Sequence, residues 1–243
     1  MNAFLSDVRQ TLIPGVDPRH GPLPPMLVCM TMVTGLVDSF SFLRLGHVFV
    51  ANSTGNILFI GFALAHVPGF SIAESLVSLG AFVIGATIGG KLNFVFEIHR
   101  GRILAVSTSL QALLIAGAVV LSLVCTVPVQ SGYRTAFIAV LAIAMGIQNA
   151  AVRKIAVPDL TTTVLTLTIT GLGADSVLVG GTGSRAGRRL VAIASMLIGA
   201  VIGAILVLHA ALCYPLVASL LLILFVAIWV MRAGKSNESW TQA

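Results

Sequence analysis

Residues 48–56 have the sequence Val-Phe-Val-Ala-Asn-Ser-Thr-Gly-Asn, which places a polar, turn-forming run inside the apolar stretch 48–67. A second run, Pro-Asp-Leu-Thr-Thr-Thr at 158–163, lies in the apolar stretch 157–180. A helix that faces lipid would carry Leu, Ile or Val at such positions, because lipid offers no hydrogen-bond partners. The two runs therefore predict broken or re-entrant segments rather than ordinary membrane crossings.

The rest of the chain has the composition of a membrane protein. Hydrophobic residues make up 57% of the 243 residues and charged residues only 9%, against about 25% charged in soluble domains. Six further apolar stretches approach the roughly 20 residues that a crossing helix needs; they are 25–46, 73–96, 103–127, 135–152, 190–211 and 215–231. We expect an all-α, polytopic transmembrane helix bundle with six crossings and two broken or re-entrant segments.

The positions of the basic residues favour six crossings over eight. If all eight stretches crossed, the 14 Lys and Arg residues would divide 8 to 6 between the two sides. If 48–67 and 157–180 return to the side from which they enter, the division becomes 12 to 2, with only Arg44 and Arg134 in the minority. Because positive residues concentrate in cytoplasmic loops, the uneven division is preferred. It predicts a cytoplasmic polar tail at 1–24, one transmembrane domain at 25–231 and a second cytoplasmic tail at 232–243.

The two halves of the chain, about 25–127 and 135–231, resemble each other. The run Gly-Leu-Val-Asp at 35–38 matches Gly-Ile-Gln-Asn at 146–149, an offset of 111, and the run at 83–89 matches 197–203 at an offset of 114. Three crossings in each half would make the second half inverted relative to the first, a plan that recurs in transporters. The matched runs also carry GxxxG spacing, which predicts close helix packing between the halves or with another subunit. These packing glycines are Gly85, Gly89, Gly199 and Gly203.

Asp38 is the only acidic residue deep in the first apolar stretch. A charge near the bilayer centre costs roughly 2.5–3.5 kcal/mol on insertion scales, and such residues often serve function. The carboxylate is a candidate cation or proton site, or a polar lock on the opposing half. The alternative is an acid near the interface that is wetted or neutralised.

The polar runs can also begin helices inside the membrane. Asn, Ser and Thr cap free backbone N–H groups, and a helix N-terminus favours anions. Two such starts from opposite sides would form a polar cavity for an anion or small polar solute, although the same groups can simply join neighbouring helices. The predicted convergent site consists of Asp38, Asn52, Thr54 and Asn56 from the first half with Gln148, Asn149, Asp159, Thr161 and Thr162 from the second.

Two paired motifs also resemble a known family. Gly-Leu-Val-Asp-Ser-Phe-Ser-Phe-Leu at 35–43 precedes the run at 48–56, and Gly-Ile-Gln-Asn-Ala-Ala-Val-Arg at 146–153 precedes 157–166. In this order the motifs are similar to the signatures of the YoaK family, bacterial multi-pass membrane proteins of unknown function. The resemblance implies a multi-pass protein of the bacterial inner membrane and supplies no substrate.

These observations favour a transporter or channel for a small polar solute or ion, with an anion or a proton as candidates. The alternative is a non-transporting scaffold that assembles through its GxxxG faces. An enzyme is not expected, because no standard catalytic motif is present, and no metal or cofactor is expected. The partners are the lipid bilayer and, as an open question, a second copy of the chain. The net charge of +6 is not a sign of nucleic-acid binding, because the basic residues sit in short clusters between apolar runs.

Overall fold

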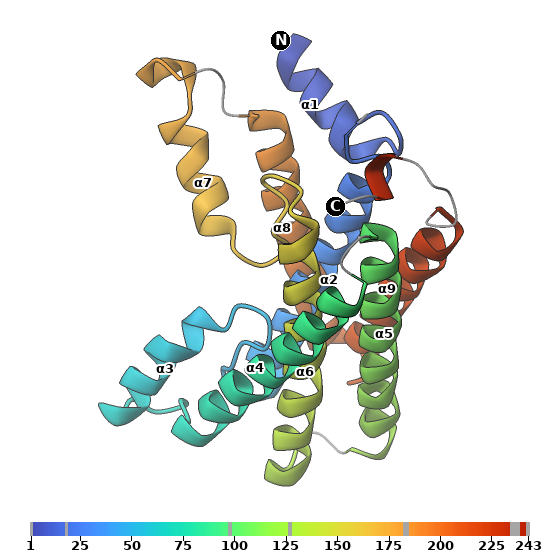
Figure 1. The fold of residues 1–243 in the computed structure, drawn as a ribbon. Coiled ribbons are helices and arrows are strands. Elements are labelled where there is room, and N and C mark those ends of the chain that lie inside the picture. The colour runs from blue at the N-terminus through green and yellow to red at the C-terminus, as the bar shows by residue number, and fades with distance from the viewer. Residues whose placement is uncertain are drawn as a thin grey trace.

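The computed structural model describes residues 2–17, 19–96, 99–125, 128–181, 185–233 and 239–241. Within these ranges the regular elements are helices, joined by turns and loops, and Asp17 and Gly21 form an isolated bridge (Figure 1). The α-helices are α1 (Asn2–Leu12), α2 (Leu23–Arg44), α3 (Thr54–Leu64), α4 (Ile72–Val95), α5 (Arg100–Val124), α6 (Ser131–Ile155), α7 (Leu165–Ala174), α8 (Ala186–His209) and α9 (Tyr214–Ala233). Two short 3-10 helices, η1 (Val177–Val179) and η2 (Ser239–Thr241), complete the list. The prediction of an all-α bundle is confirmed.

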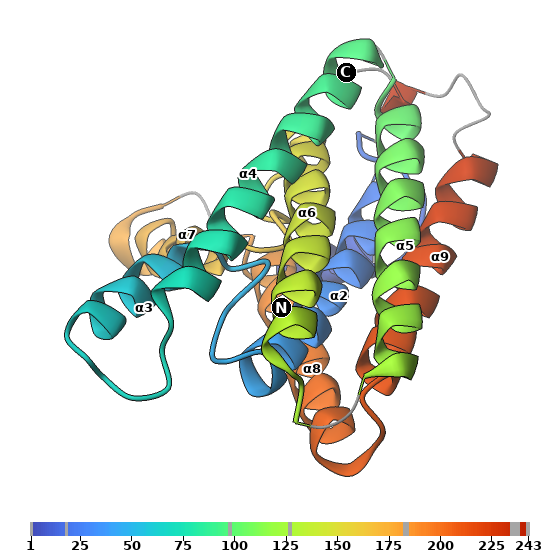
Figure 2. The same ribbon diagram turned by 90° about the horizontal axis from the view of Figure 1, so that it is seen from below.

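Six of these helices are long and apolar enough to cross a membrane, and they are the six predicted crossings. The two predicted broken segments contain α3 and α7, of 11 and 10 residues. At 1.5 Å per residue, α3 is roughly 16 Å long, about half the hydrocarbon thickness of a bilayer. Figures 1 and 2 show α3 and α7 on one flank of the long helices, with α5 and α9 on the other.

The direction of α6 relative to α2 distinguishes six crossings from eight. Gln148 of α6 hydrogen-bonds to Thr34 of α2, whereas Phe137 packs edge-on against Phe40 with ring centroids 5.7 Å apart. Residue numbers therefore rise along α2 as they fall along α6, and the two helices are antiparallel. Eight crossings would make them parallel, because they would be the first and fifth, whereas six make them the first and fourth.

The long helices pair across the two halves of the sequence. α2 packs along α8, α4 packs along α6, and α5 contacts α6 and α9. The glycines of the repeat lie in these interfaces: a Cβ added at Gly85 would meet the carbonyl of Ile143, and one added at Gly199 would meet that of Met32. The numbers of Met32 and Ile143 differ by 111 and those of Gly85 and Gly199 by 114, so the two interfaces repeat the offsets of the sequence.

The second glycine of each GxxxG pair lies in the same interface as the first. Gly89 faces Ile147 and Ala150, and Gly203 faces Leu36 and Ser39. The helix-packing glycines thus join the first half to the second within one chain.

Charged residues gather at the two ends of the bundle. Arg134, at the start of α6, pairs with Glu74 at 3.1 Å, and Arg44 donates to the carbonyl of Val207. We call this the Glu74 end. At the opposite end, the Asp159 end, Asp17 pairs with Arg188, and Asp159 pairs with Arg189. The two basic residues assigned to the minority side, Arg44 and Arg134, thus share one end.

The predicted N-terminal tail is more ordered than its polarity suggested. Residues 2–12 form α1, which packs against α8, where Gly187 allows the backbone of Phe4 to approach closely. Hydropathy alone missed this helix because it is amphipathic and lies outside the apolar stretches. Trp240, near the other terminus, is also buried, against Gly21.

Candidate functional site

Asp38 fixes the segment that leads into α3. The side chain is 5% exposed. One carboxylate oxygen accepts hydrogen bonds from the backbone N–H groups of Val50 (3.0 Å) and Ala51 (2.8 Å). The other accepts from the backbone (3.0 Å) and the side-chain amide (2.6 Å) of Asn52. Four donors therefore surround one carboxylate, which satisfies a charge that lipid could not.

The second half repeats this lock with neutral groups. Asn149, the repeat mate of Asp38 at the offset of 111, accepts a hydrogen bond from the hydroxyl of Thr163 at 2.7 Å. Thr163 corresponds to Asn52 at the same offset, so the same two positions are joined in each half. Thr163 was not among the predicted site residues, although the offset would have identified it.

Asn56 ties the start of α3 to the chain before it. Its side-chain amide accepts from the N–H of Phe49 (3.0 Å) and donates to the carbonyl of the same residue (2.6 Å). It also donates to the hydroxyl of Ser78 in α4 at 3.2 Å. Asn56 thus joins α3 to α4.

The predicted side-chain caps do not form. α3 has Ser53 as its N-cap and α7 has Val164, and neither makes a side-chain capping bond. Thr54 and Thr161 are exposed, and Thr161 donates to the carbonyl of Val164 at 3.0 Å. Asn52, Asn56, Thr162 and Thr163 are instead bonded to neighbouring helices and loops. The hydroxyl of Ser53 is buried and has no partner among the described residues.

Gln148 lies at the centre of a buried polar cluster. It is 0% exposed, accepts a hydrogen bond from Gln111 of α5 at 2.6 Å, and donates to Thr34 and Thr162 at 3.1 Å each. The cluster therefore links α2, α5, α6 and the segment before α7. The repeat mate of Gln148 is Val37, so this cluster has no counterpart in the first half. Gln111 and Thr34 were not predicted.

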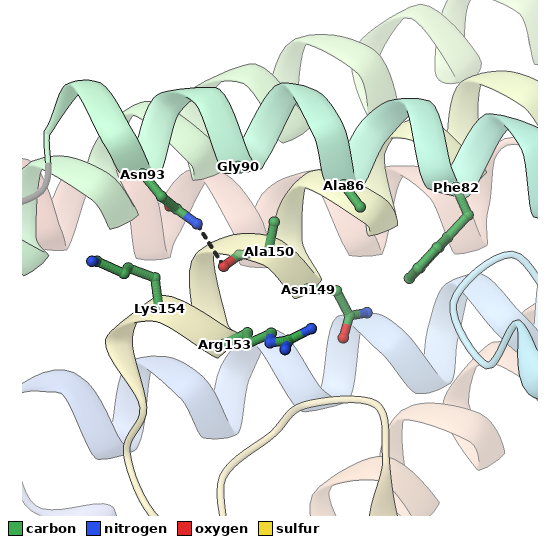
Figure 3. Close-up of a pocket in the computed structure, with 8 residues that line it drawn as sticks. All are labelled: Phe82, Ala86, Gly90, Asn93, Asn149, Ala150, Arg153 and Lys154. Atoms are coloured by element: carbon green, nitrogen blue, oxygen red, sulfur yellow. Dashed lines mark hydrogen bonds between the residues drawn. The ribbon is translucent and has the colours of Figure 1, made fainter.

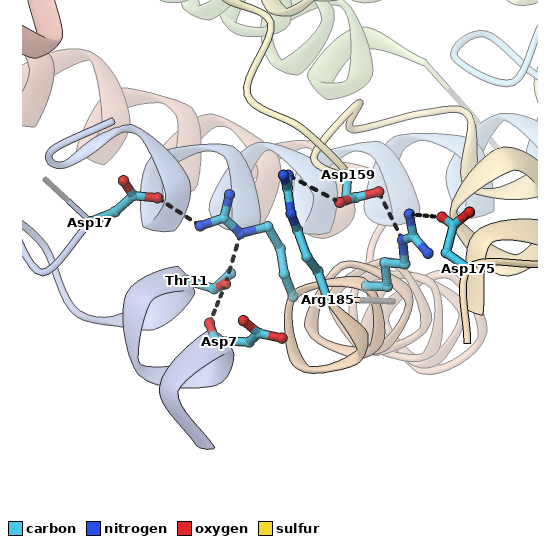
Figure 4. A network of polar contacts seen from close by, with 8 residues as sticks. Asp7, Thr11, Asp17, Asp159, Asp175 and Arg185 are labelled. Carbon is cyan, nitrogen blue, oxygen red and sulfur yellow. Dashed lines mark hydrogen bonds and ion pairs between the residues drawn. The ribbon is translucent and has the colours of Figure 1, made fainter. Parts of the chain in front are cut away.

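Asp159 belongs to an ion-pair network at its end of the bundle. It pairs with Arg189 at 2.8 Å and with Arg185 at 3.8 Å, and Arg189 also pairs with Asp175 at 2.7 Å (Figure 4). The network joins the end of α6 to α7 and α8. It gives Asp159 a structural partner that the sequence did not indicate.

A second ion pair attaches the N-terminal region to α8. Arg188 bonds to Asp17 at 2.7 Å and to the hydroxyl of Thr11 at 3.3 Å (Figure 4). Burial by itself would raise the pKa of Asp17, but the hydrogen bonds from Arg188 and from the backbone N–H groups of Arg19 and His20 outweigh it and hold that pKa below its usual range. Asp17 is therefore ionised at neutral pH and neutralises a buried guanidinium.

Two pockets flank the glycine interfaces. The α2/α8 pocket, of about 450 Å³, includes Asp38 and Asn52, and the α4/α6 pocket, of about 520 Å³, includes Asn149. The α2 residues of the first pocket correspond to the α6 residues of the second at the offset of 111 in residue number. Asp38, Ser39, Phe42 and Leu43 correspond to Asn149, Ala150, Arg153 and Lys154, in that order. The α8 residues correspond at 114: Met196, Ala200 and Ala204 become Phe82, Ala86 and Gly90.

The structure thus does not bring the predicted residues into one site. Asp38 and Asn52 line one pocket, Asn149 lines its mate (Figure 3), Gln148 and Thr162 lie in the buried cluster, and Asp159 joins the ion-pair network at one end. The two short helices do not meet either, because among the described elements α3 contacts only α4, and α7 contacts only α8 and η1. Both are apolar helices that bury few of their own residues, so their stable place is on the flank facing lipid. Within the described residues, no group of three His, Cys, Asp or Glu side chains is placed to hold a metal ion.

Comparison with known proteins agrees with this architecture. Residues 26–229 match the model of a family described as protein of unknown function (DUF1275). The chain belongs to this family. It is also 34% identical over 155 residues to the UPF0700 transmembrane protein YoaK of Bacillus subtilis (strain 168), a match covering 61% of this chain and 64% of that protein. The chain therefore spans just under two thirds of the relative's length, and no solved structure matches it.

Family membership confirms the resemblance expected from the paired motifs. Together with the six long apolar helices, it identifies the chain as a multi-pass integral membrane protein.

Proposed function

We propose that this protein is a transporter or channel for a small polar solute or ion, built as an inverted repeat in the bacterial inner membrane with both termini in the cytoplasm. The observation that carries the proposal is the pair of repeat-related pockets. The α2/α8 pocket includes Phe42 and Leu43 and lies toward the Glu74 end, whereas the α4/α6 pocket includes Arg153 and Lys154 and lies toward the Asp159 end. Inverted-repeat transporters expose their site to the two sides in turn by rocking related halves, and matched pockets toward opposite ends support such an arrangement.

The inverted repeat is supported by helix directions. Each half contributes three long helices, and α2 is antiparallel to its repeat mate α6. An odd number of crossings in each half reverses the second half. The Asp159 end carries most of the basic residues, so the positive-inside rule assigns it to the cytoplasm.

The two helix pairs joined by these glycines are the units that would move during transport. α2 with α8 and α4 with α6 form two tightly packed pairs, and each pair carries one of the pockets. Small residues let the two helices of each pair approach closely, so that each pair can move as a unit. Rocking of one pair against the other is the motion that inverted-repeat transporters use for alternating access.

The packing of the GxxxG glycines weakens the alternative of a non-transporting scaffold. The GxxxG faces that would bind a partner are occupied by α6 and α2 of the same chain. A scaffold role would therefore need another surface. A homo-oligomer remains a prediction, independent of these glycines.

The test is solute flux through proteoliposomes made with the full-length protein. Uptake of a panel of radiolabelled small acids, polyols and inorganic ions is compared with empty liposomes and with a plugged variant, Ala204→Trp, in the α2/α8 pocket. We expect at least one solute to enter with the wild type and to be blocked by the plug. Absence of protein-dependent flux for the whole panel, in protein shown to be folded, would overturn the proposal.

A further inference from the structure

The α4/α6 pocket has the form of a ligand site. Its floor is made of small residues where α4 and α6 approach closely, Ala86, Gly90 and Ala150, and Phe82 closes one end (Figure 3). A Cβ added at Gly90 would meet no atom within 4 Å, so the space beside this glycine is open. The volume of about 520 Å³ lies within the range of small-molecule sites.

Positive charge lines the mouth of this pocket. Arg153 is exposed and lines the pocket, and no described residue forms an ion pair or hydrogen bond with its guanidinium. Lys154 also lines the pocket but is engaged in an interaction of its own. A guanidinium at a partly enclosed mouth favours an anion, and its planar fork suits a carboxylate or phosphate.

Asn93 adds a requirement for a hydrogen-bond donor. It is 9% exposed, and its Nδ2 donates to the carbonyl of Ala150 at 2.8 Å. Its Oδ1 is buried and has no partner within the described part of the chain. Leaving a buried acceptor unpaired is costly, so a ligand hydroxyl that reached this oxygen, which neighbouring atoms now cover, would gain a favourable partner.

The repeat-related pocket lacks both features. At the positions of Arg153 and Lys154 it has Phe42 and Leu43, and at the position of Asn93 the second half has Val207. The oxygens of Asp38 are already engaged by the segment before α3. The recognition chemistry is therefore confined to one of two otherwise equivalent pockets.

We propose that the α4/α6 pocket binds a small organic anion that carries a hydroxyl group beside its negative charge, with Arg153 holding the anionic group and Asn93 accepting the hydroxyl. This assignment rests on the proposed transport function for its physiological meaning. A soluble hydroxy acid and the glycerol headgroup of an anionic lipid both present this chemistry.

The test measures binding rather than flux. The full-length protein in phosphatidylcholine nanodiscs is titrated calorimetrically with L-malate, with succinate, which lacks the hydroxyl, and with erythritol, which lacks the charge. We expect malate to bind more tightly than succinate, and erythritol not to bind. Arg153→Gln should weaken malate binding about tenfold or more, whereas Arg102→Gln, the same change at an exposed position of α5, should not.

Two further variants test the pocket itself. Asn93→Val, which copies the residue of the other half, should remove the preference for malate over succinate. Gly90→Leu should abolish binding, whereas Gly80→Leu, at another open glycine of α4, should not. In a parallel arm, native mass spectrometry measures whether phosphatidylglycerol is retained by the wild type and released by Arg153→Gln.

The outcomes separate the two proposals. Binding of malate or phosphatidylglycerol that depends on Arg153 and Asn93 supports the proposed site, even where no flux is found. Which of the two binds shows whether the ligand is a soluble acid or a lipid headgroup. Failure of both ligands to bind, or equal loss in Arg153→Gln and Arg102→Gln, overturns the site. Flux of another solute in that case would leave the transport function standing.

Discussion

The carboxylate of Asp38 accepts a hydrogen bond from the side chain of Asn52 at 2.6 Å, across a sequence separation of 14 residues. The same separation joins Asn149 to Thr163 at 2.7 Å in the second half. Each contact fixes the non-helical segment that precedes a short helix. Matching positions of the two halves are therefore joined in the same way, by a carboxylate acceptor in the first half and a neutral amide acceptor in the second.

Asp38→Asn should weaken the first of these locks. The amide keeps one acceptor oxygen but turns an N–H₂ group toward backbone donors, which leaves buried groups unpaired. We expect a loss of about 1–3 kcal/mol in the free energy of unfolding, with helical content retained, measured by thermal unfolding in detergent. Asn149→Ala, which removes one hydrogen bond from the matched position, should cost less.

The same variant tests the coupling role considered for Asp38. If Asp38→Asn is as stable as the wild type but loses pH-dependent solute flux, the carboxylate serves transport rather than anchoring the segment before α3. A stability loss with flux restored at lower temperature would support the anchor.

Residue pattern was a good guide to the elements and a weaker guide to the contacts. The six crossings, the two broken segments and the packing glycines follow from hydropathy, charge and the repeat offsets. The central cluster does not, because Gln148 has Val37 as its repeat mate and depends on how α5 is turned to present Gln111. The predicted caps failed because an amide that can cap a helix can equally bond to a neighbouring helix, and periodicity does not distinguish the two.

The central cluster can be tested by a double-mutant cycle on Gln111 and Gln148. Gln148→Leu alone removes the oxygen that accepts from Gln111 and the amide that donates to Thr34. Gln111→Leu alone removes the donor to the side-chain oxygen of Gln148. Because the double variant removes both amides, its loss in the free energy of unfolding should be smaller than the sum of the two single-variant losses by about 0.5–3 kcal/mol. Additive losses, measured by reversible denaturation in mixed micelles, would show that the amides do not act together.

The glycine interfaces predict matched losses in the two halves. Gly85→Ala and Gly199→Ala each place a Cβ against a backbone carbonyl, which cannot move as a flexible side chain does. Each should destabilise the protein by about 1–3 kcal/mol, and the two effects should be similar. Gly80→Ala, where a Cβ meets open space, is the control and should leave the melting temperature unchanged or raise it slightly.

The attachment of the N-terminal region should weaken in mild acid. Burial, which disfavours the charged ring, lowers the pKa of His20 below its usual 6.5, and Arg188, Arg100 and Arg19 lower it further against the opposing effect of Asp17. The released state therefore binds a proton more readily than the packed state once the pH falls below about 6.5, so the stabilisation present at neutral pH is lost on acidification. Limited proteolysis of α1 should accelerate between about pH 7.5 and 5.5, and His20→Gln should remove this dependence. The pair of Asp17 with Arg188 should persist through that range, because the lowered pKa of Asp17 keeps it ionised.

The membrane orientation can be settled by cysteine labelling in intact cells. The three native cysteines, which are only partly buried, are first replaced by Ala, and single cysteines are then introduced at exposed positions of both ends, Val67 and Gly132 at the Glu74 end and Arg153 and Arg185 at the Asp159 end. Six crossings with the basic end in the cytoplasm predict that a membrane-impermeant maleimide labels the first two positions in intact cells and the last two only after the membrane is opened. Arg153 and Arg185 are the decisive pair, because they flank α7 and would lie on opposite sides if that segment crossed the membrane. Labelling of one but not the other in intact cells would therefore make α7 a crossing and overturn the six-crossing arrangement.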